Sequence, residues 1–454
     1  MTRREYTEVP YVGGDVSVLD RFLVRSSQYH SRVAVLGASL ETSPAGYGND
    51  FSARFNALGR HFFGPGQESL VCGMVAESTR FGVQMTPQTD NGTASNYTLQ
   101  TLPGLPIAAG SGDLNYTNHA ISQLLFEGNP NVAREYQKGT YYEWDPANLR
   151  AEFFLATNPS GPQRLRWIWM PHTAAALSTG APIVQQSATD GHNEPGLQGS
   201  ANQFVKFQTP KLTSSTWAYP QMIYAGANGS NAFTAGAYMA GMRWLLADDP
   251  RPGMGVQCMG AGGLTIHNSP STGWRDLHGT AYGQFNIYGP WHLLILALGG
   301  NDAAGGVSDD THYTQLHDWI AELRGANWGQ ADVPILIITD PRIDNDDTGS
   351  GGFTAEEYTW FHRQAQVHWE VANELENVCS MNTMRLMEED GYDPSIQGAD
   401  DGTNHTADGI HYHPKWGARR AELIMRAMIR HSETGQDPRT MRLSRMAHAV
   451  RGPR

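Results

Sequence analysis

Cysteine and long apolar runs are scarce in this chain of 454 residues. It has only three cysteines, Cys72, Cys258 and Cys379. Their odd number and wide spacing predict neither a disulfide framework nor a zinc site. No apolar run is long enough to span a bilayer, and the residues that follow Met1 lack the apolar core of a signal peptide. We therefore expect a soluble protein without a transmembrane helix, either cytoplasmic or virion-associated, that the standard signal does not export.

Positive charge is scarce as well. The formal net charge is −13, and only four of the 32 basic residues are lysines. A protein that binds phosphate groups needs a basic face, so this balance argues against nucleic acid or an anionic membrane as a partner. The basic tail at residues 433–454 is too sparse to reverse that expectation. The excess of arginine over lysine suggests a GC-rich genome.

Three short motifs supply the residue types that a hydrolase with a serine nucleophile needs. One apolar run of strand length leads to Ser39, and a second leads to Asn301. In a parallel sheet such runs present a reactive side chain at the carboxyl edge. Near the end of the chain, Asp408 and His411 lie three residues apart. Together these residues offer a nucleophile, a base with an orienting carboxylate, and an amide that can stabilise an oxyanion.

The composition of the chain changes twice, which predicts two domains. Strands alternate with helices in residues 31–85 and 253–432, as in an α/β domain whose parallel sheet has right-handed crossovers. Residues 86–252 instead show many short strands between clusters of turn-forming residues, which favours an inserted antiparallel β-sandwich. Residues 1–30 show no strong periodicity, so we expect an N-terminal arm or an edge element there, and a tail at residues 433–454.

At these motifs the chain resembles the SGNH (GDSL-type) hydrolase family, whose members carry serine, glycine, asparagine and histidine in four successive blocks on a flavodoxin-like sheet. The matching residues are Ser39, Gly263, Asn301, and the Asp-x-x-His pair Asp408 and His411. The position of the insert is similar to that in esterases that remove acetyl groups from peptidoglycan or other polysaccharides. Some of those esterases hold a jelly-roll-like, carbohydrate-binding sandwich between the serine and glycine blocks.

The resemblance implies a metal-free serine esterase that needs no cofactor. In such an enzyme His411 would take the proton of Ser39, and Asp408 would orient the imidazole. The oxyanion would be held by the backbone N–H groups of Ser39 and Gly263 and by the side-chain amide of Asn301.

Two positions weaken the match to the family. Where the family usually has an aspartate before the nucleophile, this chain has Ala38, so a support of the turn is missing. In the glycine block, Gly260 could replace Gly263 as the donor.

Each of these residues could also have a role other than catalysis. Ser39 could be a small residue in a tight turn between a strand and a helix, and Asn301 could cap the helix that follows it. His405, His411 and His413 could bind a metal together with a carboxylate. The joint occurrence of the four blocks in the expected order favours the catalytic interpretation.

Two further patterns are weaker. Residues 344–349 begin like a calcium loop but lack the glutamate at position twelve, so a polar turn is favoured. Aromatic residues of the insert could stack on sugar rings, although a stripe with strand periodicity is more typical of a sandwich core. These aromatic candidates are Tyr141, Trp144, Trp167 and Trp169.

The expected substrate is an acylated glycan or another cell-envelope ester, from which the Ser39 site removes a short acyl group, foremost acetyl. Two alternatives stay open. An O-acyltransferase would use the same residues with a sugar hydroxyl in place of water. A virion-tail (minor tail or adsorption) protein with an SGNH domain, active or not, would bind or deacylate a host surface and would assemble as a homo-oligomer or in a virion tail.

Overall fold

The computed structural model divides the chain into two compact units. The first comprises Met1–Gly66, Arg251–Asp276 and Trp291–Arg454, and the second comprises Gln67–Pro250 and Leu277–Pro290. The described residues are 8–38, 40–41, 51–64, 66–68, 73–74, 84–85, 97–100, 109–112, 119–120, 149–156, 164–171, 184–185, 204–208, 218–225, 238–246, 251–258, 265–266, 285–286, 288–304, 307–326, 328–341 and 355–431.

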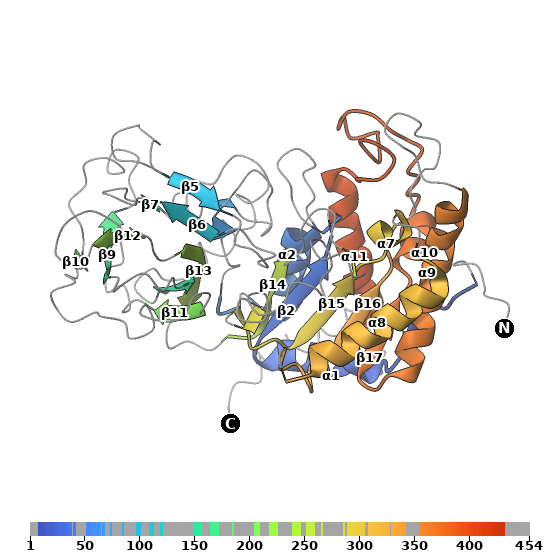
Figure 1. The fold of residues 1–454 in the computed structure, drawn as a ribbon, viewed down its shortest axis with the longest axis horizontal. Coiled ribbons are helices and arrows are strands. Elements are labelled where there is room, and N and C mark those ends of the chain that lie inside the picture. Colours follow the sequence, from blue (N-terminus) through green and yellow to red (C-terminus); the bar gives the residue numbers. More distant parts are fainter. Residues whose placement is uncertain are drawn as a thin grey trace, which may run out of the picture. The chain divides into compact units, whose positions relative to one another are not determined.

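A six-stranded sheet forms the centre of the first unit (Figure 1). In spatial order its strands are β1 (Val12–Gly14), β17 (Val378–Met381), β16 (Ile335–Ile338), β15 (Leu293–Ala297), β2 (His30–Gly37) and β14 (Gly253–Cys258). All neighbours are parallel except β1, which is antiparallel to β17 at one edge. Numbered along the chain, the five parallel strands run 2-1-3-4-5, which is the flavodoxin-like order. The predicted α/β class is confirmed.

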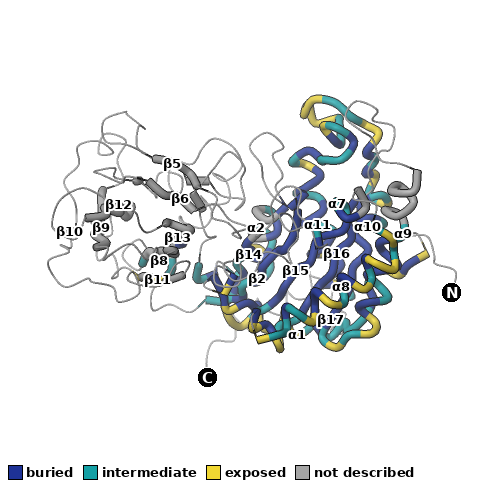
Figure 2. The backbone as a smooth tube through the Cα atoms, in the orientation of Figure 1, coloured by how far each residue is buried: buried dark blue, intermediate teal, exposed yellow. Residues whose placement is uncertain are grey.

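Helices cover both faces of this sheet. They are α1 (Ser17–Gln28), α2 (Phe51–Phe63), α7 (Gly300–Ala304), α8 (Asp309–Arg324), α9 (Ala355–Glu374), α10 (Thr383–Glu389) and α11 (Pro414–His431). Alternate strand residues such as Val33 and Ile295 share one apolar cluster with α1, α2 and α11. Residues between them, such as Ala34 and Leu296, are also fully buried. On the other face α8 packs on α9, which contacts β16 and β17. The central strands β2 and β15 are therefore buried on both faces over residues 33–36 and 293–297, where every residue is apolar (Figure 2).

The N-terminal segment differs from the predicted arm. Strand β1 is an edge element, as expected, but α1 belongs to the core of the domain. Its buried apolar residues are Val18, Leu19, Phe22 and Leu23. They recur at a spacing of four, so that they form one apolar stripe on a helix of only twelve residues. Burial of this stripe makes residues 12–28 part of the α/β fold.

Two helices of the first unit have ends that the sequence explains. The Ser308 hydroxyl caps α8 by accepting a hydrogen bond from the Thr311 N–H at 3.2 Å, and the helix stops at Gly325. Helix α11 begins at Pro414, whose missing N–H has no partner to lose at that position. No described helix has the length and apolar character needed to cross a membrane.

The second unit is built from antiparallel strands. One sheet has the order β10 (Val184–Gln185), β9 (Arg164–Pro171), β12 (Ala218–Ala225) and β7 (His119–Ala120). The other has the order β11 (Phe204–Gln208), β8 (Leu149–Ala156), β13 (Tyr238–Leu246), β6 (Ala109–Gly112) and β5 (Tyr97–Gln100). A further pair, β3 (Gly73–Met74) and β4 (Gln84–Met85), is parallel. That these sheets stack as a sandwich stays a prediction.

A buried ion pair joins two neighbouring strands of the second unit. Arg243 of β13 donates from Nε to Oε2 of Glu152 of β8 at 2.6 Å, and both side chains are buried. The unit also takes in residues 67–85 and 277–290, which the sequence pattern assigns to the α/β domain.

Candidate active site

Three of the predicted blocks follow adjacent strands at one edge of the sheet. Ser39 follows β2 and Asn301 follows β15, and these strands pair in parallel with Gly37 opposite Ala297. The glycine block with Gly263 follows β14, which pairs with β2 on its other side. Ser39 and Gly263 themselves lie outside the described residues. The carboxyl ends of β2, β14 and β15 lie side by side at the edge where the strand order reverses, which is where α/β sheets bind ligands.

His411 and Asp408 form a hydrogen-bonded pair. Nδ1 of His411 lies 2.7 Å from Oδ2 of Asp408, while Oδ1 of Asp408 accepts hydrogen bonds from the N–H groups of Ile410 at 3.0 Å and of His411 at 2.7 Å. Gly409 permits this tight turn with a φ of 79°, a conformation that side chains disfavour. An ionised carboxylate can only accept, so Nδ1 of the neutral ring carries the proton and Nε2 is left as a base.

The surroundings of Asp408 keep its carboxylate ionised. Burial opposes ionisation, but the hydrogen bonds from the side chain and backbone of His411 outweigh it and lower the pKa of Asp408 to about 2. The side chains are not sealed off, since 21% of His411 and 34% of Asp408 is exposed. The imidazole is therefore partly accessible to solvent.

Tyr412 connects the histidine block to the serine block. Its hydroxyl donates to the carbonyl oxygen of Leu40 at 2.6 Å, and this bond is buried. Leu40 and Tyr412 also share an apolar cluster with Trp416. The residue after His411 is thus bonded to the residue after Ser39, across 372 positions of the chain.

Asp302 connects the asparagine block to the chain that follows the glycine block. Its buried carboxylate accepts from the N–H of Ile266 with both oxygens, at 3.1 and 3.2 Å. Ile266 comes three positions after Gly263 in the sequence, and this contact holds Ile266 beside α7. Asn301 is half-buried in the first turn of α7.

A buried charged cluster beneath the sheet edge was not predicted from the sequence. Arg420 of α11 forms ion pairs with Glu41 and with Asp340, whose Oδ1 lies 3.6 Å from Nη2 of Arg420. Arg420 also donates to the carbonyl oxygen of Thr339 at 2.9 Å. Burial raises the pKa of both carboxyl groups, and the guanidinium opposes that rise.

A sequence signal for this cluster existed. Arg420 lies four residues after Trp416 and four before Ile424, on the buried stripe of α11. A charged residue at such a position has to find partners of opposite charge, because an unpaired buried charge is very costly.

The other histidines of the block make backbone contacts. Nδ1 of His405 accepts from the N–H of Asp393 at 2.9 Å, and Nε2 of His413 lies 2.9 Å from the carbonyl oxygen of Gly398. Within the described part of the chain, no three histidine, cysteine or acidic side chains cluster as metal ligands would. The calcium-like residues 344–349 lie outside that part.

The aromatic candidates belong to the second unit. Trp167 and Trp169 lie on β9, opposite Met222 and Pro220 of β12. Tyr141 and Trp144 lie outside the described residues. Their role in sugar binding stays a prediction.

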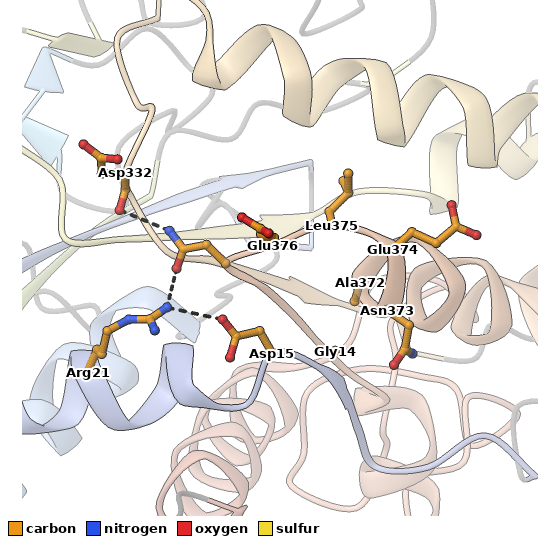
Figure 3. A pocket seen from close by; sticks show the side chains of 10 residues that line it. Gly14, Asp15, Arg21, Asp332, Ala372, Asn373, Glu374, Leu375 and Glu376 are labelled. Atoms are coloured by element: carbon orange, nitrogen blue, oxygen red, sulfur yellow. Dashed lines mark hydrogen bonds and ion pairs between the residues drawn. The ribbon is translucent and has the colours of Figure 1, made fainter.

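A separate hollow lies at the amino edge of the same sheet (Figure 3). Arg21 bridges Asp15 at 3.4 Å and Asn377 at 2.5 Å, and Asn377 donates to the carbonyl oxygen of Asp332 at 3.1 Å. Asn377 immediately precedes β17, whereas Asn301 follows the carboxyl end of the parallel strand β15. The hollow is therefore at the opposite edge from the candidate active site.

No protein-family model and no curated protein matches the sequence. Among solved structures, the chain is similar to a peptidoglycan O-acetylesterase at 12% identity, covering 93% of this chain and 96% of that one, with a TM-score of 0.46. An acetyl xylan esterase from Geobacillus stearothermophilus is 16% identical over 40% of this chain and 74% of its own, with a TM-score of 0.27. A salicylyl-acyltransferase from a tetracycline biosynthetic pathway is 10% identical over 77% and 98%, with a TM-score of 0.30.

Proposed function

We propose that this protein is a serine esterase that uses Ser39, His411 and Asp408. The observation that carries the proposal is the His411–Asp408 pair, whose neighbour Tyr412 is bonded to the residue after Ser39. Nucleophilic acyl transfer uses an imidazole that a carboxylate orients within reach of a serine hydroxyl, and the bond from Tyr412 to Leu40 supports such a placement of His411 and Ser39.

The chemistry runs in two halves. Oγ of Ser39 attacks the acyl carbon while Nε2 of His411 accepts the hydroxyl proton. The tetrahedral intermediate then collapses, the bond to the leaving alcohol breaks, and His411 returns the proton to that alcohol. Water repeats the sequence on the acyl-enzyme and releases the carboxylic acid and Ser39. Asp408 stabilises the imidazolium in both halves.

The oxyanion of the intermediate is assigned to three donors: the N–H groups of Ser39 and Gly263 and the side-chain amide of Asn301. Loss of one such donor typically lowers the rate by about 10²–10³-fold. We expect Asn301→Ala to lower kcat by this factor, because the oxyanion would lose one hydrogen bond as it forms. Steady-state kinetics and thermal unfolding of wild type and Asn301→Ala test this prediction. Unchanged kcat in the folded variant would remove Asn301 from the oxyanion hole.

The proposed substrate is a glycan or cell-envelope polymer with short O-acyl groups, foremost acetyl. Support comes from the insert between the serine and glycine blocks, whose described strands form two antiparallel sheets. We infer that these sheets pack as a jelly-roll-like sandwich that orients the polymer, with Trp167 and Trp169 of β9 as candidates for stacking on sugar rings. The acyltransferase and the virion-tail protein stay alternatives.

The test is hydrolysis of p-nitrophenyl acetate and p-nitrophenyl butyrate, followed by acetate release from O-acetylated peptidoglycan and acetylated xylan. We expect turnover of the acetyl ester with a higher kcat/KM than the butyryl ester, and acetate release from one of the polymers. Acyl transfer to an added sugar in place of acetate release would favour the acyltransferase. The absence of turnover on every ester would contradict the proposed function.

A further inference from the structure

Arg420 lies where three segments of the candidate site converge. Its guanidinium is fully buried and packs over the ring of Phe51 at 5.4 Å, at the start of α2. Through its ion pairs it reaches Glu41, two positions after Ser39, and Asp340, which follows β16. It also donates to the hydroxyl of Tyr412 at 3.3 Å. One cation therefore contacts groups from several parts of the site.

Each partner of Arg420 holds a different block. Oε2 of Glu41 accepts from the N–H of Ala38 at 3.1 Å, so Glu41 closes the turn around Ser39. Oδ2 of Asp340 accepts from the N–H of Gly300 at 2.7 Å, directly before Asn301. These are the contacts that fix where a nucleophile and an oxyanion donor emerge from their strands.

The partner Tyr412 holds the third block. Its hydroxyl bonds to the Leu40 carbonyl and lies next to His411 in sequence. The serine turn is thus fixed on both sides of Ser39, by Glu41 at Ala38 and by Tyr412 at Leu40.

Glu41 fits its place closely. A Cβ atom added at Gly37 would come within 2.6 Å of Oε2 of Glu41, so the carboxylate lies directly against the end of β2. The usual aspartate of the family is absent at Ala38, and a carboxylate three positions later bonds to the N–H of that residue. Glu41 therefore supplies a carboxylate that supports this turn in the absence of an aspartate at position 38.

We infer that Glu41, Asp340 and Tyr412, gathered on Arg420, are positioning residues that hold the serine, asparagine and histidine segments in register for acyl transfer. This inference rests on the proposed function. None of these side chains is assigned a contact with substrate; they act through Ser39, Asn301 and His411. A displacement of about 1 Å of a reacting group can cost about 10²-fold in rate, so such support has a large effect on kcat.

The decisive variant is Glu41→Gln. Its side chain has one carbonyl oxygen, whereas the carboxylate of Glu41 serves Arg420 with one oxygen and the Ala38 N–H with the other. Whichever way the amide turns, an NH₂ group faces a donor and one of the two contacts is lost. The volume is unchanged, and the cluster keeps Arg420 paired with Asp340, so the variant is expected to fold.

The matched control is Glu422→Gln, at a residue of α11, the helix that also carries Arg420. Glu422 accepts from Arg54 at 3.0 Å and from Arg419 at 2.8 Å, in a half-buried network next to the buried one. Both substitutions replace a carboxylate that accepts from two donors, at least one of them an arginine, but none of the contacts named for Glu422 involves a block of the site. Tyr412→Phe is the second test variant, because it removes only the hydroxyl.

We expect Glu41→Gln to lower kcat for p-nitrophenyl acetate by about ten- to one hundredfold and to leave KM within about twofold of wild type. The value of kcat is calculated per active site, with the active sites counted by titration with a fluorophosphonate. Tyr412→Phe should lower kcat in the same direction, and Glu422→Gln should leave it within twofold. Equal kcat in Glu41→Gln and wild type, or an equal loss in Glu422→Gln, would overturn the inference, because a role in folding alone would not separate the two variants.

Hydrogen exchange provides a readout that does not need turnover. In Glu41→Gln, the peptide that holds Ala38 should exchange at least about tenfold faster, whereas in Glu422→Gln it should match wild type. Unchanged exchange at this amide would overturn the inference even if the wild type is active. If the wild type hydrolyses no ester, the proposed function fails, and faster exchange would still establish that Arg420 and its partners hold the segments together.

Discussion

The His411→Ala variant is expected to hydrolyse p-nitrophenyl acetate with a kcat lowered by about 10⁴-fold or more. Alanine cannot accept the proton of Ser39, and a serine hydroxyl that stays protonated is a poor nucleophile at neutral pH. The remaining rate would come from substrate binding and the oxyanion donors alone. Because His411 is partly exposed on a loop, its removal leaves the apolar core of the α/β unit intact.

The control for this variant is His61→Ala. His61 is exposed in the last turn of α2, so the same substitution there should leave kcat and thermal unfolding close to wild type. Steady-state kinetics and circular dichroism of the three proteins measure the effect. Retention of more than a tenth of the wild-type kcat in folded His411→Ala would rule out this histidine as the general base.

The Asp408→Asn variant is expected to lose about 10⁴-fold in kcat while it keeps its fold. The asparagine carbonyl oxygen can still accept from the N–H groups of Ile410 and His411, as Oδ1 of Asp408 does. Its NH₂ group then faces Nδ1 of His411, which has to become the acceptor. The proton moves to Nε2, and the imidazole can no longer take the proton of Ser39.

Kinetics of Asp408→Asn beside Asp408→Ala test this reasoning. The alanine variant loses the turn as well as the charge, so it should lose stability in addition to activity. An Asp408→Asn variant with wild-type kcat would mean that the tautomer of His411 is set by another group.

The pKa of Asp408 also predicts how stability depends on pH. Its folded-state pKa is lowered from the usual 3.8 to about 2. The ionised carboxylate therefore stabilises the fold above about pH 4, and this contribution is lost as the pH falls from there toward 2. Acid unfolding of wild type should be steeper in this range than that of Asp408→Asn, which has no carboxyl group to protonate. Parallel acid-unfolding curves would contradict the assignment.

Much of the α/β unit could be predicted because its signals are local. Residues 33–36 of β2 and all residues of β15 are apolar, as strands buried on both faces require, and a glycine follows each run, at Gly37 and at Gly299. The pair Asp408 and His411 could be predicted for the same reason, since a turn of four residues contains both partners. The order of the blocks along the chain then indicated which strands should be neighbours.

The charged cluster could not be predicted in this way, because its partners are distant in sequence. Arg420 and Glu41 are 379 positions apart, and nothing in the residues around Glu41 indicates that it is buried. The core helix α1 was missed because its apolar stripe is short. Both the Arg420 cluster and the burial of α1 depend on contacts between residues far apart in the sequence, and a local sequence pattern does not show such contacts.

The most direct test of the central claim is covalent labelling with a fluorophosphonate, followed by mass spectrometry of the peptide that holds Ser39. In wild type, Oγ of Ser39 should displace fluoride from phosphorus and form a stable adduct, and His411→Ala should label far more slowly. Stoichiometric adduct on Ser39 is the predicted result. An unlabelled Ser39, or an adduct on another serine at the same rate in both proteins, would contradict Ser39 as the nucleophile.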